Sequence, residues 1–232
     1  MFWDNVAGVY DIFTNIINRK THKGLCTKVE EEITKTDEVL ECACGTGLLS
    51  GVIAKKCKSL VATDFSVKML QKASKKHRAY SNIEFREGNI LAIEYPNETF
   101  DIVVAANVIH LLDEPYKALA ELDRVCRKGG KIIVPTYMNK NDKGKTSGFA
   151  NTVGKAGADF KRQFTYETYM EFIKKAGYEN VEYSLIEGKI PCAVAGLFLG
   201  ASFNNAIGGC ILGVLISGIA CIIYVLDNQD KN

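Results

Sequence analysis

The feature that most constrains the fold is an alternation of short apolar segments with amphipathic ones between residues 37 and 199. Glycines or helix-capping residues separate the two kinds of segment. The apolar segments predict seven strands, at residues 37–42, 60–63, 83–85, 100–106, 131–134, 181–187 and 191–199. Because strands that alternate with helices form βαβ units, we expect an α/β protein with a doubly wound, mostly parallel seven-stranded sheet.

Capping residues mark where the helices should begin and end. Ser66 is expected to be the N-cap of the helix that precedes the third strand. Asp113 is expected to cap a helix that has Pro115 in its first turn and that ends at Gly129-Gly130. A further helix is expected from Thr165 to Ala176, where a glycine follows.

Composition narrows the class of protein. Of the 232 residues, 47% are hydrophobic and 24% are charged, which allows a sizeable core and excludes wholesale disorder. The formal net charge of +2 gives no electrostatic footprint for nucleic acid. Eight cysteines are far below the density of a small disulfide scaffold. Residues 1–4 lack the basic and apolar regions of a signal peptide, so we expect a cytoplasmic protein with reduced thiols.

Glycines and polar residues follow four neighbouring strands, at the edge where such sheets bind ligands. The first strand runs into a loop from Glu41 to Gly47, whose glycines allow the backbone to approach a ligand closely. The second strand ends in Asp64, which is placed to accept hydrogen bonds from both hydroxyls of a ribose. Polar residues follow the next two strands, at 88–90 and 107–110. This combination predicts a site for a nucleoside-containing ligand.

These motifs resemble those of the class I S-adenosylmethionine-dependent methyltransferases, in particular the group that includes the ubiquinone/menaquinone-biosynthesis C-methyltransferases. The resemblance covers about residues 1–195. Two positions depart from the family's pattern: Ala43 lies where the first glycine is usual, and Asn89 lies where an aspartate is usual. The matching segments are residues 39–47, 62–70, 88–90, 100–110 and 122–130.

The resemblance implies S-adenosylmethionine as the cofactor, and it implies a role for each matched residue. The loop that contains Glu41, Ala43, Cys44, Gly45 and Gly47 would hold the methionine moiety, and Asp64 would hold the ribose. The other implied contacts are Phe65 and Met69 beside the adenine, Asn89 and Ile90 at its edge, Asn107 closing the pocket, and Tyr10 covering it from an N-terminal helix.

A nicotinamide-dependent oxidoreductase is the rival interpretation of the glycine loop, because Gly45, Gly47 and Ser50 come close to the dinucleotide-binding pattern. Three features count against it: an acid precedes the glycines, Ser50 replaces the third glycine, and no tyrosine is followed four residues later by lysine. No Gly-Lys-Ser/Thr follows the glycines, which excludes a Walker A loop.

No metal site and no certain catalytic base emerge from the sequence. Cys42 and Cys44 have no second cysteine or histidine pair at zinc spacing, so we interpret them as packing residues. His110 is the one histidine in a loop expected near the ligand. It is a weak candidate for taking a proton from the substrate, and lining the pocket is the simpler interpretation.

The chain divides by composition into three parts. We expect residues 1–36 to form a helical cap over the cofactor site and residues 37–200 to form the methyltransferase domain. From Ile190 to Leu226 there is no charged residue, and residues 206–226 are long enough to span a bilayer as one helix. The alternatives are an apolar helix buried against the domain and an extension foreign to the family. Gly209, Gly213 and Ser217 form a small-residue ridge suited to self-association in membranes.

The function that we expect is methyl transfer from S-adenosylmethionine to a small-molecule or lipid-like acceptor by a cytoplasmic domain anchored through its tail. A basic stretch at residues 140–162 is either a solvated loop or a substrate lid that can meet anionic lipid. The alternative from another class is a membrane-tethered module that binds an adenosyl ligand without catalysis. A third is that the tail itself is the function, as an oligomerising membrane segment.

The membrane interpretation of the tail makes a testable prediction. Full-length protein should resist extraction from membranes by carbonate, and a chain that ends near Gly200 should be extracted and still bind cofactor. Leu215→Arg should cost on the order of 2.5–3.5 kcal/mol of insertion free energy, because it places a charge at the centre of the span. A full-length protein that is monomeric without detergent would contradict the anchor.

Overall fold

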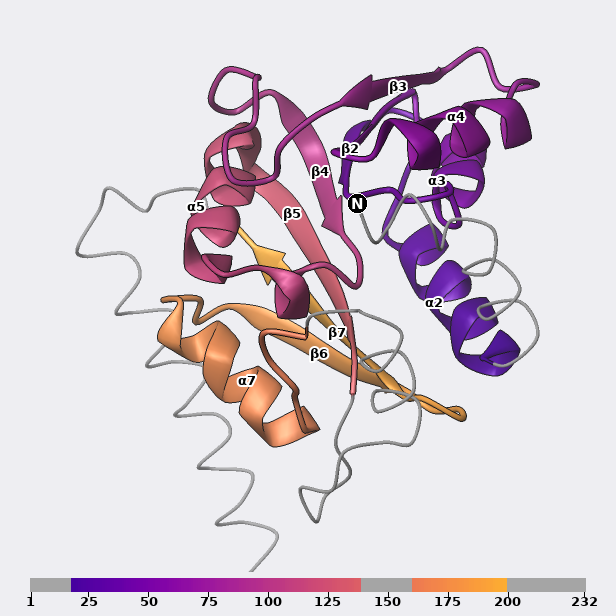
Figure 1. Cartoon of the computed structure of the whole chain (residues 1–232). Coiled ribbons are helices and arrows are strands. Elements are labelled where there is room, and N and C mark those ends of the chain that lie inside the picture. The colour runs from indigo at the N-terminus through magenta and orange to yellow at the C-terminus, as the bar shows by residue number, and fades with distance from the viewer. Residues whose placement is uncertain (1–17, 139–159, 200–232) are drawn as a thin grey trace, which may run out of the picture. The chain divides into compact units, whose positions relative to one another are not determined.

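The computed structural model describes residues 18–138 and 160–199. Its helices are α2 (Arg19–Glu31), α3 (Ser50–Lys56), α4 (Val67–Lys76), the 3₁₀ helix η2 (Ile109–Leu111), α5 (Pro115–Val125) and α7 (Tyr166–Lys175). Its strands are β1 (Glu38–Cys42), β2 (Ser59–Asp64), β3 (Ile83–Glu87), β4 (Phe100–Ala105), β5 (Cys126–Tyr137), β6 (Val181–Ile186) and β7 (Cys192–Phe198). The alternation of strands and helices and the seven strands are therefore confirmed (Figure 1).

The seven strands form one sheet in the order β3-β2-β1-β4-β5-β7-β6. The first five pair in parallel, as expected. β7 is antiparallel to both of its neighbours, so the sheet is mixed and the prediction of a mostly parallel sheet was wrong. The reason lies in the connection from Ile186 to Cys192, which is too short for a parallel crossover and allows only a hairpin.

Helices cover both faces of the sheet. On one face α2, α3 and α4 pack on Val39, Leu60 and Val104. On the other face α5 and α7 pack on Leu40 and Val103. Figure 1 shows these two groups of helices on opposite sides of the strands. Neighbouring residues of β1 thus enter different cores, which is why the strand is apolar on both faces.

The helix boundaries agree with the capping signals at two places and differ at two. The Ser66 hydroxyl accepts a hydrogen bond from Met69 N–H at 3.2 Å, and Thr165 is the N-cap of α7, so both predicted helix starts are confirmed. Asp113 does not cap α5: its N-cap residue is Glu114, and Asp113 forms an ion pair with Lys161 instead. The structure ends α5 at Val125, before the glycine pair, because β5 already begins at the next residue.

The chain forms two units, Met1–Leu199 and Gly200–Asn232, and the second lies outside the described residues. The predicted span at 206–226 and the expected C-terminal helix therefore lie outside them too. Within residues 18–138 and 160–199, no helix is both long enough and apolar enough to cross a membrane. α2, from the predicted cap, packs into the same core as β1 through Leu25 and Val29.

Candidate cofactor site

A pocket lies where β1, β2 and β4 end, and residues from the loops after these strands line it. Eight of the predicted site residues line it together, namely Glu41, Ala43, Cys44, Gly45, Asp64, Phe65, Met69 and Asn107. Eight residues that were not predicted complete the lining: His22, Leu25, Leu48, Leu49, Ala106, Val108, Leu111 and Tyr137. The pocket therefore combines a polar floor, made by the loop after β1 and by Asp64, with apolar walls.

The backbone around the pocket takes the left-handed conformation at four places. Ala43, Gly45 and Gly47 have φ angles of 54°, 56° and 75°, and Asn107, after β4, has a φ of 55°. Glycine adopts this region without strain, whereas a residue with a Cβ is strained by on the order of 1–2 kcal/mol. Strained backbone of this kind concentrates at ligand sites. The loop after β1 is therefore shaped for close approach of a ligand, even though Ala43 replaces the family's glycine.

Asp64 links the two loops that follow β1 and β2. Its carboxylate accepts one hydrogen bond from Gly45 N–H at 2.8 Å and one from Ser66 N–H at 2.9 Å. The side chain is only 6% exposed, so these bonds form in a largely desolvated place. A carboxylate can accept about four hydrogen bonds, so these two do not exclude hydrogen bonds from the ribose hydroxyls.

Glu41 is the most deeply buried acid of the pocket, at 2% exposure. Burial raises the pKa of its carboxyl to about 8, although the Ser50 hydroxyl donates a hydrogen bond to it at 2.6 Å. The neighbouring charge of Asp64 raises the pKa of Glu41 further. Glu41 is thus protonated at neutral pH in the protein alone, and a cation placed beside it would favour its ionised form.

Asn107 joins the ends of β4 and β5. Its backbone N–H donates to Pro135 O at 2.7 Å, and its side-chain oxygen accepts from Tyr137 N–H at 3.0 Å. These two bonds fix the wall of the pocket formed by Ala106 to Val108.

The structure does not bring every predicted site residue into the pocket. Asn89 lies in a separate hollow with Thr63, Gly88 and Tyr95, and its side-chain oxygen accepts from Leu91 N–H at 2.9 Å. Ile90 packs against the core on the α5 side. Tyr10 and most of the predicted lid lie outside the described residues.

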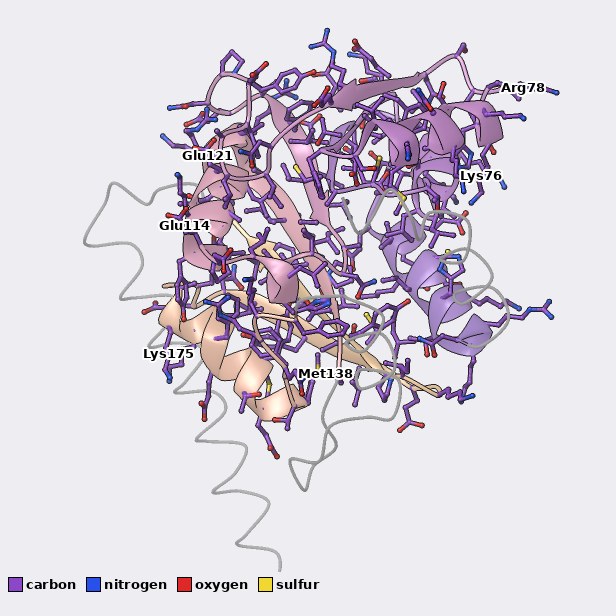
Figure 2. All side chains as sticks on the ribbon, viewed as in Figure 1. Lys76, Arg78, Glu114, Glu121, Met138 and Lys175 are labelled. Carbon is purple, nitrogen blue, oxygen red and sulfur yellow. The ribbon has the colours of Figure 1, made fainter. Side chains whose placement is uncertain are left out.

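Gly47 is in the loop but does not line the pocket. A Cβ at this position would lie 2.9–3.2 Å from His77 and Ala73, beside the end of α4, where Figure 2 marks Lys76 and Arg78. The glycine is needed for its left-handed turn and for this close packing. Close packing is therefore a second reason for this glycine, and its contact with the methionine moiety stays a prediction.

His110 lies beside the pocket, not in its lining. Its ring is 3% exposed and stacks on Phe160 with 5.6 Å between ring centroids, and its Nδ1 has no hydrogen-bond partner among the described residues. Burial lowers the pKa of His110 to about 4, so the imidazole is neutral at physiological pH. Direct contact with a substrate in the pocket would require this side chain to turn towards it.

The cysteines near the site behave as packing residues. Cys42 and Cys44 are 1% and 7% exposed, and burial raises the pKa of both thiols. Among the residues that the structure describes, no group of three histidine, cysteine or acidic side chains is placed to hold a metal ion.

Comparisons with known proteins identify the class of this domain. The family model described as "Methyltransferase domain" matches residues 40–134. The chain is 32% identical over 137 residues to a demethylmenaquinone methyltransferase of Renibacterium salmoninarum, covering 58% of this chain and 56% of that protein. It is also 32% identical over 126 residues to a phosphatidylethanolamine N-methyltransferase of Cereibacter sphaeroides, covering 50% of this chain and 61% of that protein.

Among solved structures, the fold matches the N-methyltransferase NodS of Bradyrhizobium japonicum WM9 in complex with S-adenosyl-L-homocysteine. The TM-score is 0.60 at 18% identity, and the match covers 78% of this chain and 86% of that chain. The chain thus contains a segment that matches a methyltransferase domain, and its described residues have the fold of a solved methyltransferase. It spans little more than half the length of these two curated relatives.

Some of the pocket residues that were not predicted could have been found from the sequence, and others could not. Tyr137 ends β5, so the rule that ligands bind at the carboxyl ends of strands could have indicated it. Leu48 and Leu49 follow the glycine motif directly. His22 and Leu25 lie on α2, outside every motif, and long-range contacts of that helix, including its packing against β1, place them at the pocket.

The two glycines of the loop should respond differently to alanine. Gly45→Ala should cost on the order of 1–2 kcal/mol of unfolding free energy, because its φ is positive but no atom lies within 4 Å of the new methyl group. Gly47→Ala should cost more, because its methyl group also meets His77 and Ala73. Urea denaturation measures both. Ala43→Gly is the control and should lose little or no stability. Equal losses of unfolding free energy in Gly45→Ala and Gly47→Ala would contradict the close packing of Gly47 against His77 and Ala73.

The buried Glu41 should make stability depend on pH. Its pKa is raised from 4.5 to about 8, so its contribution is fully present below pH 4.5 and is lost as the pH rises to about 8. Within that window the wild-type protein should lose up to about 1.4 kcal/mol of unfolding free energy per pH unit relative to Glu41→Gln. Urea denaturation of both proteins from pH 5 to 8, without cofactor, tests this. Parallel curves would show that Glu41 ionises normally.

Proposed function

We propose that this protein transfers a methyl group from S-adenosylmethionine to a small-molecule or lipid-like acceptor. The observation that carries the proposal is the joining of the left-handed loop after β1 to Asp64 through Gly45 N–H. The left-handed loop and Asp64, the acid proposed to hold the ribose, line the same pocket, which supports the proposal. The proposed contacts of Asn89, Ile90 and Tyr10 with the cofactor remain part of the proposal and rest on the motif resemblance.

Two relatives support the proposed acceptor class. They are named as methyltransferases of demethylmenaquinone and of phosphatidylethanolamine, and both molecules are lipids. The apolar walls of the pocket, formed by Leu111, Val108 and Tyr137, favour an acceptor with an apolar surface.

Catalysis of methyl transfer requires mainly that the cofactor and the acceptor are held in the correct relative orientation. S-adenosylmethionine supplies a methyl group that its sulfonium already activates, so orientation and exclusion of water account for most of the acceleration. In this chain the loop after β1 would bind the cofactor, and Asn107 would hold the wall beside it. His110 is outside the pocket lining, so the proposal assigns it no proton transfer.

Localisation is proposed from sequence alone. The domain would lie in the cytoplasm, with residues 206–226 as a membrane anchor that brings it close to lipid acceptors. The uncharged stretch from Ile190 to Leu226 supports this proposal.

The acceptor can be tested directly. The full-length protein would be incubated with methyl-labelled S-adenosylmethionine and, separately, demethylmenaquinone, phosphatidylethanolamine and a water-soluble phenol. Label that moves into a lipid fraction supports the proposal. Cofactor binding without transfer to any member of a wider acceptor screen would favour the binding module. Tighter binding of NAD than of S-adenosylmethionine would favour the oxidoreductase.

Asp64 supplies a quantitative prediction for the cofactor. Asp64→Asn should weaken binding of S-adenosylhomocysteine by on the order of 1–3 kcal/mol, because it removes the charged acceptor proposed for the ribose hydroxyls. Titration calorimetry measures the affinity. Asp101→Asn is a matched control, because Asp101 pairs with Arg127 and does not line the pocket. Unchanged affinity in Asp64→Asn would contradict the ribose assignment.

A further inference from the structure

The charges around the pocket are unbalanced. Glu41 and Asp64 supply two acidic side chains, whereas His22 is the one side chain among the described lining residues that can carry a positive charge. The methionine end of S-adenosylmethionine carries an ammonium group and a carboxylate. The acids suit the ammonium group, beside which Glu41 would ionise, and in their ionised form they repel the carboxylate, which needs hydrogen-bond donors or a cation.

Three backbone N–H groups of the loop after β1 already donate within the protein, which leaves few donors there for that carboxylate. Cys44 N–H donates to Thr63 O at 2.9 Å, and Gly45 N–H donates to Asp64 at 2.8 Å. Gly47 N–H donates to Cys44 O at 2.9 Å. A side chain from another element can supply the donor that these three N–H groups do not.

α2 presents such a side chain at the pocket. His22 and Leu25 lie nearly one helical turn apart, and both line it. The Nε2 atom of His22 lies 3.7 Å from the Cys26 sulfur, so the ring is placed along the helix. Leu25 is 2% exposed and packs in the core beside Cys44, which fixes the distance of this turn from the loop after β1.

The first turn of α2 is held in place by the hairpin between β6 and β7. The Asn18 side chain donates to Ile190 O at 3.1 Å and accepts from Ile190 N–H at 3.0 Å. The Thr21 hydroxyl lies 3.0 Å from Ile190 O and 2.8 Å from the Asn18 side-chain oxygen. His22 N–H donates to Asn18 O at 3.0 Å, so His22 is attached directly to this buried cluster.

We propose that His22 binds the α-carboxylate of the methionine moiety of S-adenosylmethionine. The proposal rests on the proposed function and deepens it, because it names a cofactor contact that no motif of the chain contains. Neutral histidine donates one N–H and its protonated form donates two, so either form can serve as the donor. Asn18 and Thr21 are positioning residues for His22.

The test compares two ligands that differ only in the carboxylate, S-adenosylmethionine and its decarboxylated form. Titration calorimetry on the full-length protein gives both affinities for the wild type and for His22→Ala. His22→Ala should weaken binding of S-adenosylmethionine about tenfold to a hundredfold and leave binding of the decarboxylated form nearly unchanged. His22→Lys, which restores a cation, should recover part of the loss.

Controls separate this proposal from a structural role of α2. Lys23→Ala removes the next cation along the helix, which is exposed and outside the pocket, and should change neither affinity. An equal loss for both ligands in His22→Ala, or an unchanged affinity for both, would overturn the proposal. A wild-type protein that binds neither ligand would instead contradict the proposed function.

Discussion

The site depends on one carboxylate that joins two strands' loops. Parallel pairing of β1 with β2 places Cys42 beside Thr63, and Asp64 therefore comes next to the loop that leaves β1. Asp64 accepts hydrogen bonds from backbone N–H groups of both loops, and it therefore fixes the conformation of the glycine loop together with the start of α4. A buried carboxylate without these donors would be costly, so the two loops and the acid stabilise one another.

Much of this arrangement could be predicted from local sequence. The alternation of predicted strands and helices indicates the parallel part of the sheet. The chemistry of Gly45 and Asp64 indicates a nucleoside ligand at the edge of the sheet where the parallel strands end. The parallel pairing of the strands then determines where the site lies, because the loops that follow parallel strands all leave the sheet at the same edge. This is why eight predicted residues, from the ends of three strands and the segments that follow them, line a single pocket.

The parts that escaped prediction depend on long-range packing. The antiparallel direction of β7 follows from the short connection after β6. The short distance between the two predicted strands already indicated a hairpin, but the strand–helix alternation of the rest of the chain favoured a parallel sheet. Gly47 was attributed to the ligand, but its neighbour is His77, thirty residues further along. His22 belongs to no motif, and its place at the pocket results from contacts that Asn18 makes with Ile190.

The bond between Asn18 and Ile190 also bears on how the protein folds as it is synthesised. The partners are 172 residues apart, so α2 emerges from the ribosome long before the strand that fixes its first turn. β1 to β5 are neighbours in the sheet without β6 or β7 between them, so neither their pairing nor the bond of Gly45 to Asp64 needs a contact with the hairpin. If His22 binds the carboxylate as proposed, a nascent chain would hold the nucleoside part of the pocket before the part that binds the methionine end. Tight retention of the cofactor would then begin only when the hairpin has been translated.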